Sequence, residues 1–141
     1  MKISIGSDHA GFELKEHIKK YLEEKGHELI DEGTNSLDSV DYPDFGKAVG
    51  ERVSSKDADF GVVVCGSGIG ISIAANKVQG IRCARVSEPL SAKLSRQHND
   101  ANVVALGARL IGTTMAEEIV DEFLNNEFEG GRHSNRVCKL D

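Results

Sequence analysis

The stretch from Phe60 to Lys77 constrains the fold more than any other part of the chain. It begins with an apolar, β-branched run at 60–64, continues as C-G-S-G-I-G, and ends in a segment of helical character at 71–77. An apolar run of this length, preceded by a polar segment, is typical of a strand buried on both faces of a parallel sheet. The stretch therefore predicts a central strand, a glycine loop and a helix.

The glycine loop suits the binding of an anion. Such a junction points several backbone N–H groups into one space, and the helix N-terminus adds partial positive charge. A thiol there, that of Cys65, is expected to ionise more readily than a free cysteine. The spacing differs from the G-x-G-x-x-G of dinucleotide-binding folds and lacks the Gly-Lys-Ser/Thr of a Walker A loop. The alternative is a tight turn of small residues beside a buried structural cysteine.

Length and composition exclude several classes of protein. The 141 residues are enough for one domain, and 39% hydrophobic with 28% charged residues is ordinary for a globular protein. A net charge of -6 argues against broad nucleic-acid binding. No apolar run approaches the roughly 18 residues of a membrane span, and the N-terminal run is too short for a signal peptide. We therefore expect no nucleic-acid or membrane partner.

The cysteines indicate a reducing compartment. Cys65, Cys83 and Cys138 are odd in number and far apart, which suits the cytoplasm rather than a disulfide framework. We interpret Cys83, inside a predicted strand, as a core residue and Cys138 as incidental. No C-x-x-C or H-E-x-x-H spacing suggests a metal site, so no metal or other cofactor is expected.

Strands and helices alternate along the whole chain. Strands are predicted at 2–5, 27–31, 60–64, 81–86 and 102–106, and helices at 12–25, 43–54, 71–77, 89–98 and 114–128. Thr114 and Glu117 form a capping-box pattern at the start of the last helix. The alternation predicts an α/β fold, with a parallel sheet covered by helices on both faces in a three-layer αβα sandwich. We expect one domain spanning 1–141.

Polar groups follow several of these strands at their carboxyl ends, where ligands bind in such folds. They are Asp8 with His9, Asp41 with Tyr42, the segment Cys65 to Gly70, and Arg109. We expect the tail at 129–141 to fold back and join them. A carboxylate beside an imidazole can move protons or bind a sugar hydroxyl, although Asp8 could instead cap the first helix.

Two further groups lie away from the strand ends in sequence. His98 and Asn99 end the fourth predicted helix, where a histidine could equally be a surface residue at a favourable helix terminus. Arg132 and Arg136 are four residues apart after two glycines. If the tail is helical, both point to one side and suit a phosphate. The alternative for these arginines is a solvated basic tail.

Several separated motifs resemble the ribose/galactose isomerase family, and within it the type B ribose-5-phosphate isomerases. The resemblance covers nearly the whole chain and keeps the motifs in order. They are SDHAGFELK at 7–15, DYPDF at 41–45, CGSGIGISIAANK at 65–77, GIRCARVSEPLSAKLSRQHNDANVVALGARLIG at 80–112 and EGGRHSNRV at 129–137.

The resemblance implies an aldose–ketose isomerase that interconverts D-ribose 5-phosphate and D-ribulose 5-phosphate, in the pentose phosphate pathway, through a cis-enediolate and without a metal. It makes Cys65 the base that moves a proton between C2 and C1, and His98 with Asp8 the pair that opens the furanose ring. The loop N–H groups would hold the enediolate oxygen, and the Ser67 hydroxyl would assist. The loop residues implied in substrate binding are Gly66, Gly68, Ile69 and Gly70.

The resemblance also implies how the rest of the substrate is held. His9, Arg109, Arg132 and Arg136 would bind the phosphate, and Tyr42 and Asn99 would line the sugar site. Family members are homodimers or dimers of dimers whose sites are completed across the dimer interface. By this resemblance, His98, Asn99 and Arg109 could contribute to the site of the neighbouring subunit. The implied five-stranded sheet has the order 2-1-3-5-4. Some members use a glutamate as the base, but Ile71-Ser72-Ile73 offers no carboxylate here.

Two alternatives stay open at this point. The substrate could be allose 6-phosphate or galactose 6-phosphate, with the loop around Tyr42 deciding how long a sugar fits. The chain could also be a non-catalytic module that binds sugar phosphates or FMN. A pure binder has no need of Cys65, whereas an isomerase depends on it.

Overall fold

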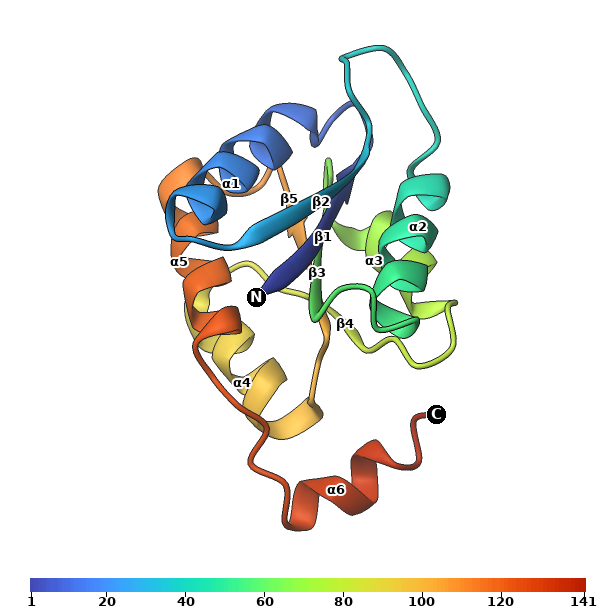
Figure 1. Ribbon diagram of the computed structural model, residues 1–141, viewed down its shortest axis with the longest axis vertical. Coiled ribbons are helices and arrows are strands. Elements are labelled where there is room, and N and C mark those ends of the chain that lie inside the picture. The colour runs from blue at the N-terminus through green and yellow to red at the C-terminus, as the bar shows by residue number, and fades with distance from the viewer.

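The computed structural model describes residues 1–141 as one five-stranded sheet with helices on both faces (Figure 1). All neighbouring strands are parallel, and their order is β2-β1-β3-β5-β4. The strands are β1 (Lys2–Ser7), β2 (Glu28–Gly33), β3 (Phe60–Cys65), β4 (Cys83–Arg85) and β5 (Val103–Gly107). The helices are α1 (Phe12–Glu24), α2 (Tyr42–Ser54), α3 (Ile69–Asn76), α4 (Pro89–Asn99), α5 (Thr113–Leu124) and α6 (Arg132–Val137). The predicted fold class and strand order are confirmed.

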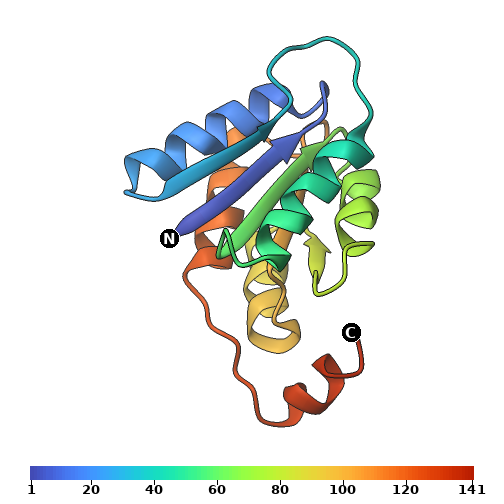
Figure 2. The ribbon, with the colours of Figure 1, turned by 45° about the vertical axis from the view of Figure 1, so that its right-hand side comes forward.

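Alternation along the strands divides the core into two parts. In β3, Val62 and Val64 pack against α1, α4 and α5, while Val63 and Cys65 pack against α2 and α3. Figures 1 and 2 show these two helix layers on opposite faces of the sheet. Since successive side chains of a strand point to opposite faces, a strand buried on both sides needs apolar residues throughout. The position of Cys65 in the α2/α3 layer follows from this period of two.

The two cores differ in size. The larger contains the apolar face of α1 and the aromatic pair Phe60 and Phe123, whose ring centroids are 5.6 Å apart in an edge-to-face arrangement. The smaller lies between the sheet and α2 with α3, and includes Val49 and Ile71, both fully buried. Each such side chain contributes about 1.5–3 kcal/mol through removal from water. The glycine loop is thus anchored between two packed layers.

The start of α5 differs from the sequence prediction. Gly112 is the N-cap residue, and no side chain caps the helix. Glu117 does not reach back to the helix start, because its carboxylate pairs with His17 Nε2 on α1 at 2.6 Å. The capping-box prediction for Thr114 and Glu117 is therefore wrong. The same helix ends at Leu124 rather than near residue 128.

The tail lies elsewhere than predicted. Helix α6 sits beyond the amino ends of the strands, at the opposite end of the molecule from the loops that follow β1, β2 and β3 (Figures 1 and 2). The expectation that residues 129–141 fold back to the carboxyl edge of their own sheet is wrong. The physical reason is direction: helices between parallel strands run opposite to them, so α5 ends at the amino edge and delivers the tail there.

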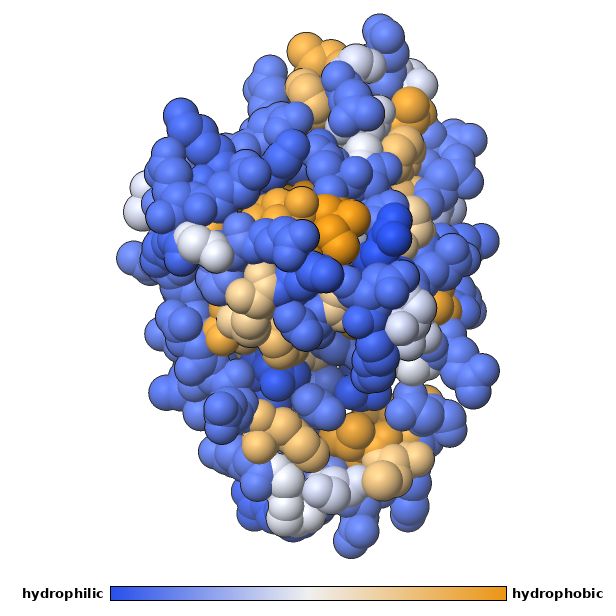
Figure 3. All heavy atoms as spheres, in the orientation of Figure 1, coloured by the Kyte–Doolittle hydropathy of each residue, from blue (hydrophilic) through white to orange (hydrophobic).

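None of the helices is both long and apolar enough to cross a bilayer. In the orientation of Figure 1 the surface is mostly hydrophilic, and its apolar areas are separate patches (Figure 3). Among the exposed apolar side chains are Ile69 and Ile73 of α3, each about half exposed.

Candidate active site

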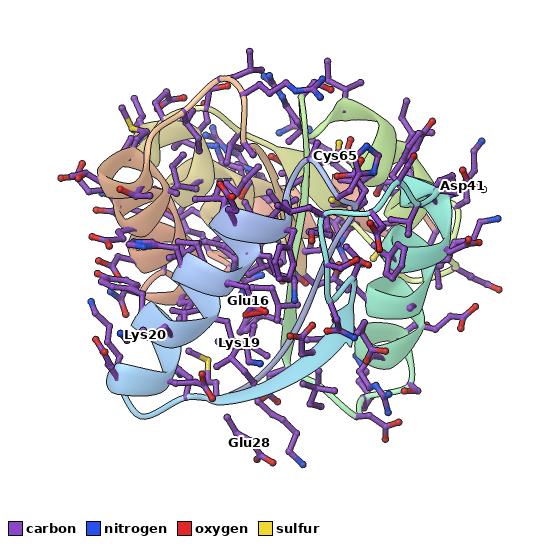
Figure 4. The ribbon with its side chains drawn as sticks, turned by 90° about the horizontal axis from the view of Figure 1, so that it is seen from above. Glu16, Lys19, Lys20, Glu28, Asp41 and Cys65 are labelled. Carbon is purple, nitrogen blue, oxygen red and sulfur yellow. The ribbon has the colours of Figure 1, made fainter.

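A cavity of about 520 Å³ opens at the carboxyl edge of the sheet. Its lining comes from the loops after β1, β3 and β5 and from the start of α2. The lining residues are Asp8, His9, Ala10, Tyr42, Cys65, Gly66, Ser67, Ile69, Gly70, Arg109 and Leu110. Figure 4 looks onto this edge and shows Cys65 between the two helix layers, with Asp41 further out at the start of α2. Of the predicted site residues that follow the strands, all but Gly68 line this cavity.

Cys65 ends β3 and is only 5% exposed. Its sulfur accepts a hydrogen bond from the N–H of Gly68 at 3.2 Å. Gly68 has φ +77°, and a Cβ there would lie 2.8 Å from the carbonyl carbon of Leu106. The tight turn that turns the N–H toward the thiol therefore requires glycine at this position.

Some of the other backbone N–H groups of the loop have a hydrogen-bond partner within the chain and others have none. Ile69 N–H donates to Ser67 Oγ at 3.2 Å, so the serine hydroxyl closes the loop. The N–H groups of Gly66 and Ser67 donate to no partner within the chain. The N–H of Gly70 also has no partner within the chain, so three donors of the predicted oxyanion-binding segment are left free for a ligand oxygen.

Arg85 holds the loop in place, and no sequence signal assigned it a role. Its Nε donates to the carbonyl of Ser67 at 3.0 Å and its Nη1 to Ser87 Oγ at 2.9 Å. The N–H of Arg109 donates to the carbonyl of Gly66 at 3.0 Å. The loop is thus tied to β4 and to the end of β5. The one hint in the sequence was that Arg85, a charged residue, lies within a predicted strand.

Asp8 and His9 are fixed by backbone donors. Asp8 is 7% exposed, and its Oδ1 accepts the N–H of Gly11 at 3.0 Å. One carboxylate oxygen therefore does cap the turn before α1, while the residue still lines the cavity. His9 Nδ1 accepts the N–H of Val40 at 3.1 Å, which assigns the proton of the neutral ring to Nε2. His9 can therefore donate a hydrogen bond from Nε2.

Tyr42 and Arg109 close the sides of the cavity. A Cβ on Gly70 would lie 2.7 Å from the Tyr42 ring, so the ring passes directly over the backbone of that glycine. A Cβ on Gly66 would lie 3.2 Å from Arg109 Nη1. The resemblance suggested that Arg109 could serve the site of the neighbouring subunit. The structure places it in the cavity of its own chain.

The remaining predicted site residues form a separate group at the other end of the molecule. His98 and Asn99 end α4, and Arg132 and Arg136 belong to α6. None of these four lines the cavity around Cys65. The tail is helical as the arginine spacing required, and neither arginine makes a salt bridge within the chain. Both guanidinium groups are exposed and available to an anion.

Two neighbours of His98 were missed by sequence reasoning. The His98 and His133 rings stack with centroids 4.5 Å apart and an interplanar angle of 14°. Glu129 Oε1 lies 3.7 Å from His98 Nε2 and 3.6 Å from His133 Nε2. Desolvation, then the charges of His98 and Arg132, lower the pKa of His133. The sequence feature that could have revealed this group is the spacing of Glu129 and His133, which are four residues apart in the tail.

The other cysteines differ from Cys65. Cys83 packs against the smaller core, and burial raises the pKa of its thiol to about 12. Its backbone N–H and C=O both bond to the Asn76 side chain. Cys138 is exposed at the end of α6. Cys83 is thus partly buried at the edge of the core rather than inside it, and Cys65 is the cysteine that meets the cavity.

Comparison with known proteins gives one consistent result. The family model for Ribose/Galactose Isomerase matches residues 3–140. Ribose-5-phosphate isomerase B of Escherichia coli (strain K12) is 52% identical over 136 residues, which are 96% of this chain and 91% of that protein. The solved Ribose-5-Phosphate Isomerase B of Clostridium thermocellum is 55% identical, with a TM-score of 0.98 over 99% of this chain and 95% of that one.

A further solved relative contains a ligand. It is Ribose-5-phosphate Isomerase B from Mycoplasma genitalium with bound ribulose-5-phosphate, at 42% identity and a TM-score of 0.94. The match covers 99% of this chain and 93% of that one. Family model, sequence relatives and solved structures agree along almost the full length, and the chain belongs to the ribose/galactose isomerase family.

Proposed function

We propose that the protein interconverts D-ribose 5-phosphate and D-ribulose 5-phosphate. The observation that carries the proposal is the Cys65 thiol, a potential base, in one cavity with the free backbone N–H groups of Gly66, Ser67 and Gly70. Proton abstraction next to a carbonyl needs a base and a stabilised oxyanion, and this edge offers both. The relatives named for this reaction, one of them with bound ribulose-5-phosphate, support the substrate.

The isomerisation moves two protons, one from C2 to C1 and one from the C2 oxygen to the C1 oxygen. The Cys65 thiolate takes the proton from C2 of the open-chain aldose, and the C1 carbonyl becomes the oxygen of a cis-enediolate. The N–H groups of Gly66 and Ser67 stabilise that negative oxygen. The thiol then returns that proton to C1, and the hydroxyl proton of O2 passes to O1, so that C2 becomes the ketone carbonyl and C1 a hydroxymethyl group. With both transfers, atoms and charge balance without an added oxidant or cofactor.

Ring opening and substrate binding use residues from both the cavity around Cys65 and the α4–α6 end of the molecule. His98, with Asp8, transfers the proton that opens the furanose, and the Ser67 hydroxyl supports the loop. Arg132 and Arg136 bind the phosphate together with His9 and Arg109, because guanidinium groups form charge-assisted hydrogen bonds with phosphate oxygens. Tyr42 and Asn99 line the sugar.

A second copy of the chain completes the site in this proposal. Cys65 and His98 lie at opposite ends of one subunit, so one chain cannot apply both to one sugar. A two-fold dimer, or a dimer of dimers, would bring α4 and α6 of one subunit to the carboxyl edge of its partner. The half-exposed Ile69 and Ile73 on α3 provide apolar surface beside that edge. All three cysteines are free, which suits the cytoplasm, where we place the enzyme.

Mixing two inactive variants tests the shared site. Cys65→Ala and His98→Asn subunits, refolded together, form mixed dimers with one intact site. Random pairing then restores about one quarter of wild-type turnover, because half the dimers are mixed and each has one intact site of two. If each chain carried a complete site, the mixture would stay inactive.

Incubation with ribose 5-phosphate in D₂O, followed by NMR, tests the reaction itself. Formation of ribulose 5-phosphate, lost in Cys65→Ala, supports the isomerase and its base together. Turnover of allose 6-phosphate or galactose 6-phosphate instead would move the proposal to a longer sugar. Binding without any turnover would favour a non-catalytic module.

A further inference from the structure

The group around Glu129 has the composition of a metal site. Two imidazoles and one carboxylate, from His98, His133 and Glu129, offer ligand atoms that all lie within 4.8 Å of one another. Imidazole and carboxylate together suit zinc and related transition-metal ions. We propose that these three residues bind a divalent transition-metal ion such as Zn²⁺, and that the bound ion inhibits the enzyme by occupying His98.

The distances are close to those of a bound ion. Ligand atoms about 2.0–2.1 Å from a tetrahedral zinc lie roughly 3.3–3.4 Å apart. Glu129 Oε1 is 3.6 Å and 3.7 Å from the two Nε2 atoms, so shifts of a few tenths of an ångström bring both pairs into range. The stacked rings must also tilt toward a common point, and the 39% exposed side chain of His98 has room to turn.

The three residues are held together by the backbone. Glu129 N–H donates to the carbonyl of Gln97 at 3.0 Å, which ties the tail to the last turn of α4 beside His98. The N–H of His133 bonds to the carbonyl of Gly130 at 3.1 Å. Because these bonds fix the chain on both sides, the ligands are gathered before an ion arrives.

Charge makes Glu129 the decisive ligand. Arg132 and Arg136 belong to the same short helix as His133 and oppose a cation. Glu129 is the one anionic ligand of the set, so its replacement by the neutral isostere glutamine removes the main attraction for the ion. A fourth position stays open to water or to a ligand of the partner subunit.

The inhibitory part rests on the proposed function, whereas binding of the ion does not. Titration calorimetry with Zn²⁺ measures binding without turnover, on the full chain and on Glu129→Gln, His133→Gln and the matched control Glu127→Gln. Glu127 is an exposed carboxylate two residues away. We expect wild type and control to bind alike, and the other two variants to bind at least about tenfold more weakly. Equal binding by all four proteins would overturn the site.

Inhibition is measured on the same four proteins. Zn²⁺ should inhibit wild type and Glu127→Gln at the concentration at which it binds, and EDTA should restore turnover fully. Glu129→Gln should retain its metal-free turnover and need at least about tenfold more Zn²⁺ for half inhibition. Inhibition that is equal in Glu129→Gln and wild type would place the ion elsewhere, for example on a cysteine, and would refute the proposal.

Discussion

The cavity around Cys65 and the α4–α6 end of the molecule are built in opposite ways. In the cavity, Cys65 and Asp8 are almost fully buried, and backbone N–H groups hold both. At the other end, Arg132 and Arg136 are exposed and unpaired within the chain. The difference fits the two proposed tasks of these regions. A base must be positioned before the substrate arrives, whereas residues that bind an anion must keep their donors free for it.

The comparison also explains why the two groups lie so far apart. Strand ends supply the buried group, since packed layers on both faces immobilise the loop after β3. Helix ends supply the exposed group, since α4 and α5 run opposite to the strands and end at the amino edge. In the proposed function, one subunit therefore carries the base Cys65 at one edge, and the ring-opening His98 with the two phosphate-binding arginines at the other.

The largest effect should come from Cys65→Ala. Loss of the base should lower kcat by about 10²–10⁴-fold, while binding of the phosphosugar is retained. The matched control is Cys138→Ala, which alters an exposed cysteine and should leave kcat unchanged. Steady-state kinetics and calorimetry with ribose 5-phosphate check both. A variant with near-normal kcat would remove Cys65 from the chemistry and end the contrast between the two regions.

Arg136→Ala should act in the complementary way. Removal of a charge-assisted hydrogen bond to phosphate should raise KM by about 10–100-fold, with a smaller effect on kcat. Lys139→Ala, an exposed cation three residues on, is the control and should change KM little. If Arg136→Ala and Cys65→Ala raised KM equally, the division between chemical and binding halves would be refuted.

Gly68→Ala tests whether the loop geometry matters to the chemical half. The left-handed backbone and the 2.8 Å approach to Leu106 should cost about 2 kcal/mol of folding free energy and lower Tm by roughly 5 °C. Turnover should fall as well, because the N–H of Gly68 leaves the Cys65 sulfur. Gly112→Ala is the control, since a Cβ at that position meets nothing within 4 Å. Thermal unfolding and steady-state kinetics are measured on both variants. Equal Tm values would contradict the predicted backbone strain in Gly68→Ala.

The smallest effect should be that of chelators. Dialysis of the purified protein against EDTA should neither lower kcat nor raise KM, because both halves act through protein groups alone in the proposed mechanism. The assay after dialysis, with and without added Mg²⁺, is sufficient. Lost activity that a divalent cation restores would show that one half needs a metal to work.

Much of the fold followed from local patterns. The run at 60–64 and the glycines after Cys65 predicted a buried strand, a glycine loop and a helix, and all three are present. The strand-end residues Asp8, Tyr42 and Arg109 were predicted to meet and do line one cavity. These inferences succeed because parallel strands bring their carboxyl ends to one edge whatever the helices between them do.

Predictions that depended on a partner across space were less reliable. The capping box at Thr114 is absent because Glu117 binds His17 of another helix. Arg85 was not assigned a role, because its partner, the carbonyl of Ser67, is distant in sequence. Glu129 was not assigned either, because it lies near two imidazoles, one on another helix and one in the next turn of the tail. Residue spacing alone does not identify which of several possible partners a long polar side chain reaches.

The sequence by itself determined the parallel sheet, the glycine loop and the place of Cys65 at its mouth, because apolar periodicity and glycine positions act within a few residues. Only the tertiary structure decided that His98, Arg132 and Arg136 lie at the opposite end of the subunit from Cys65. That outcome depends on the direction of α4 and α5 across the whole sheet and on where the tail then packs, and long-range packing of this kind is encoded in no single motif.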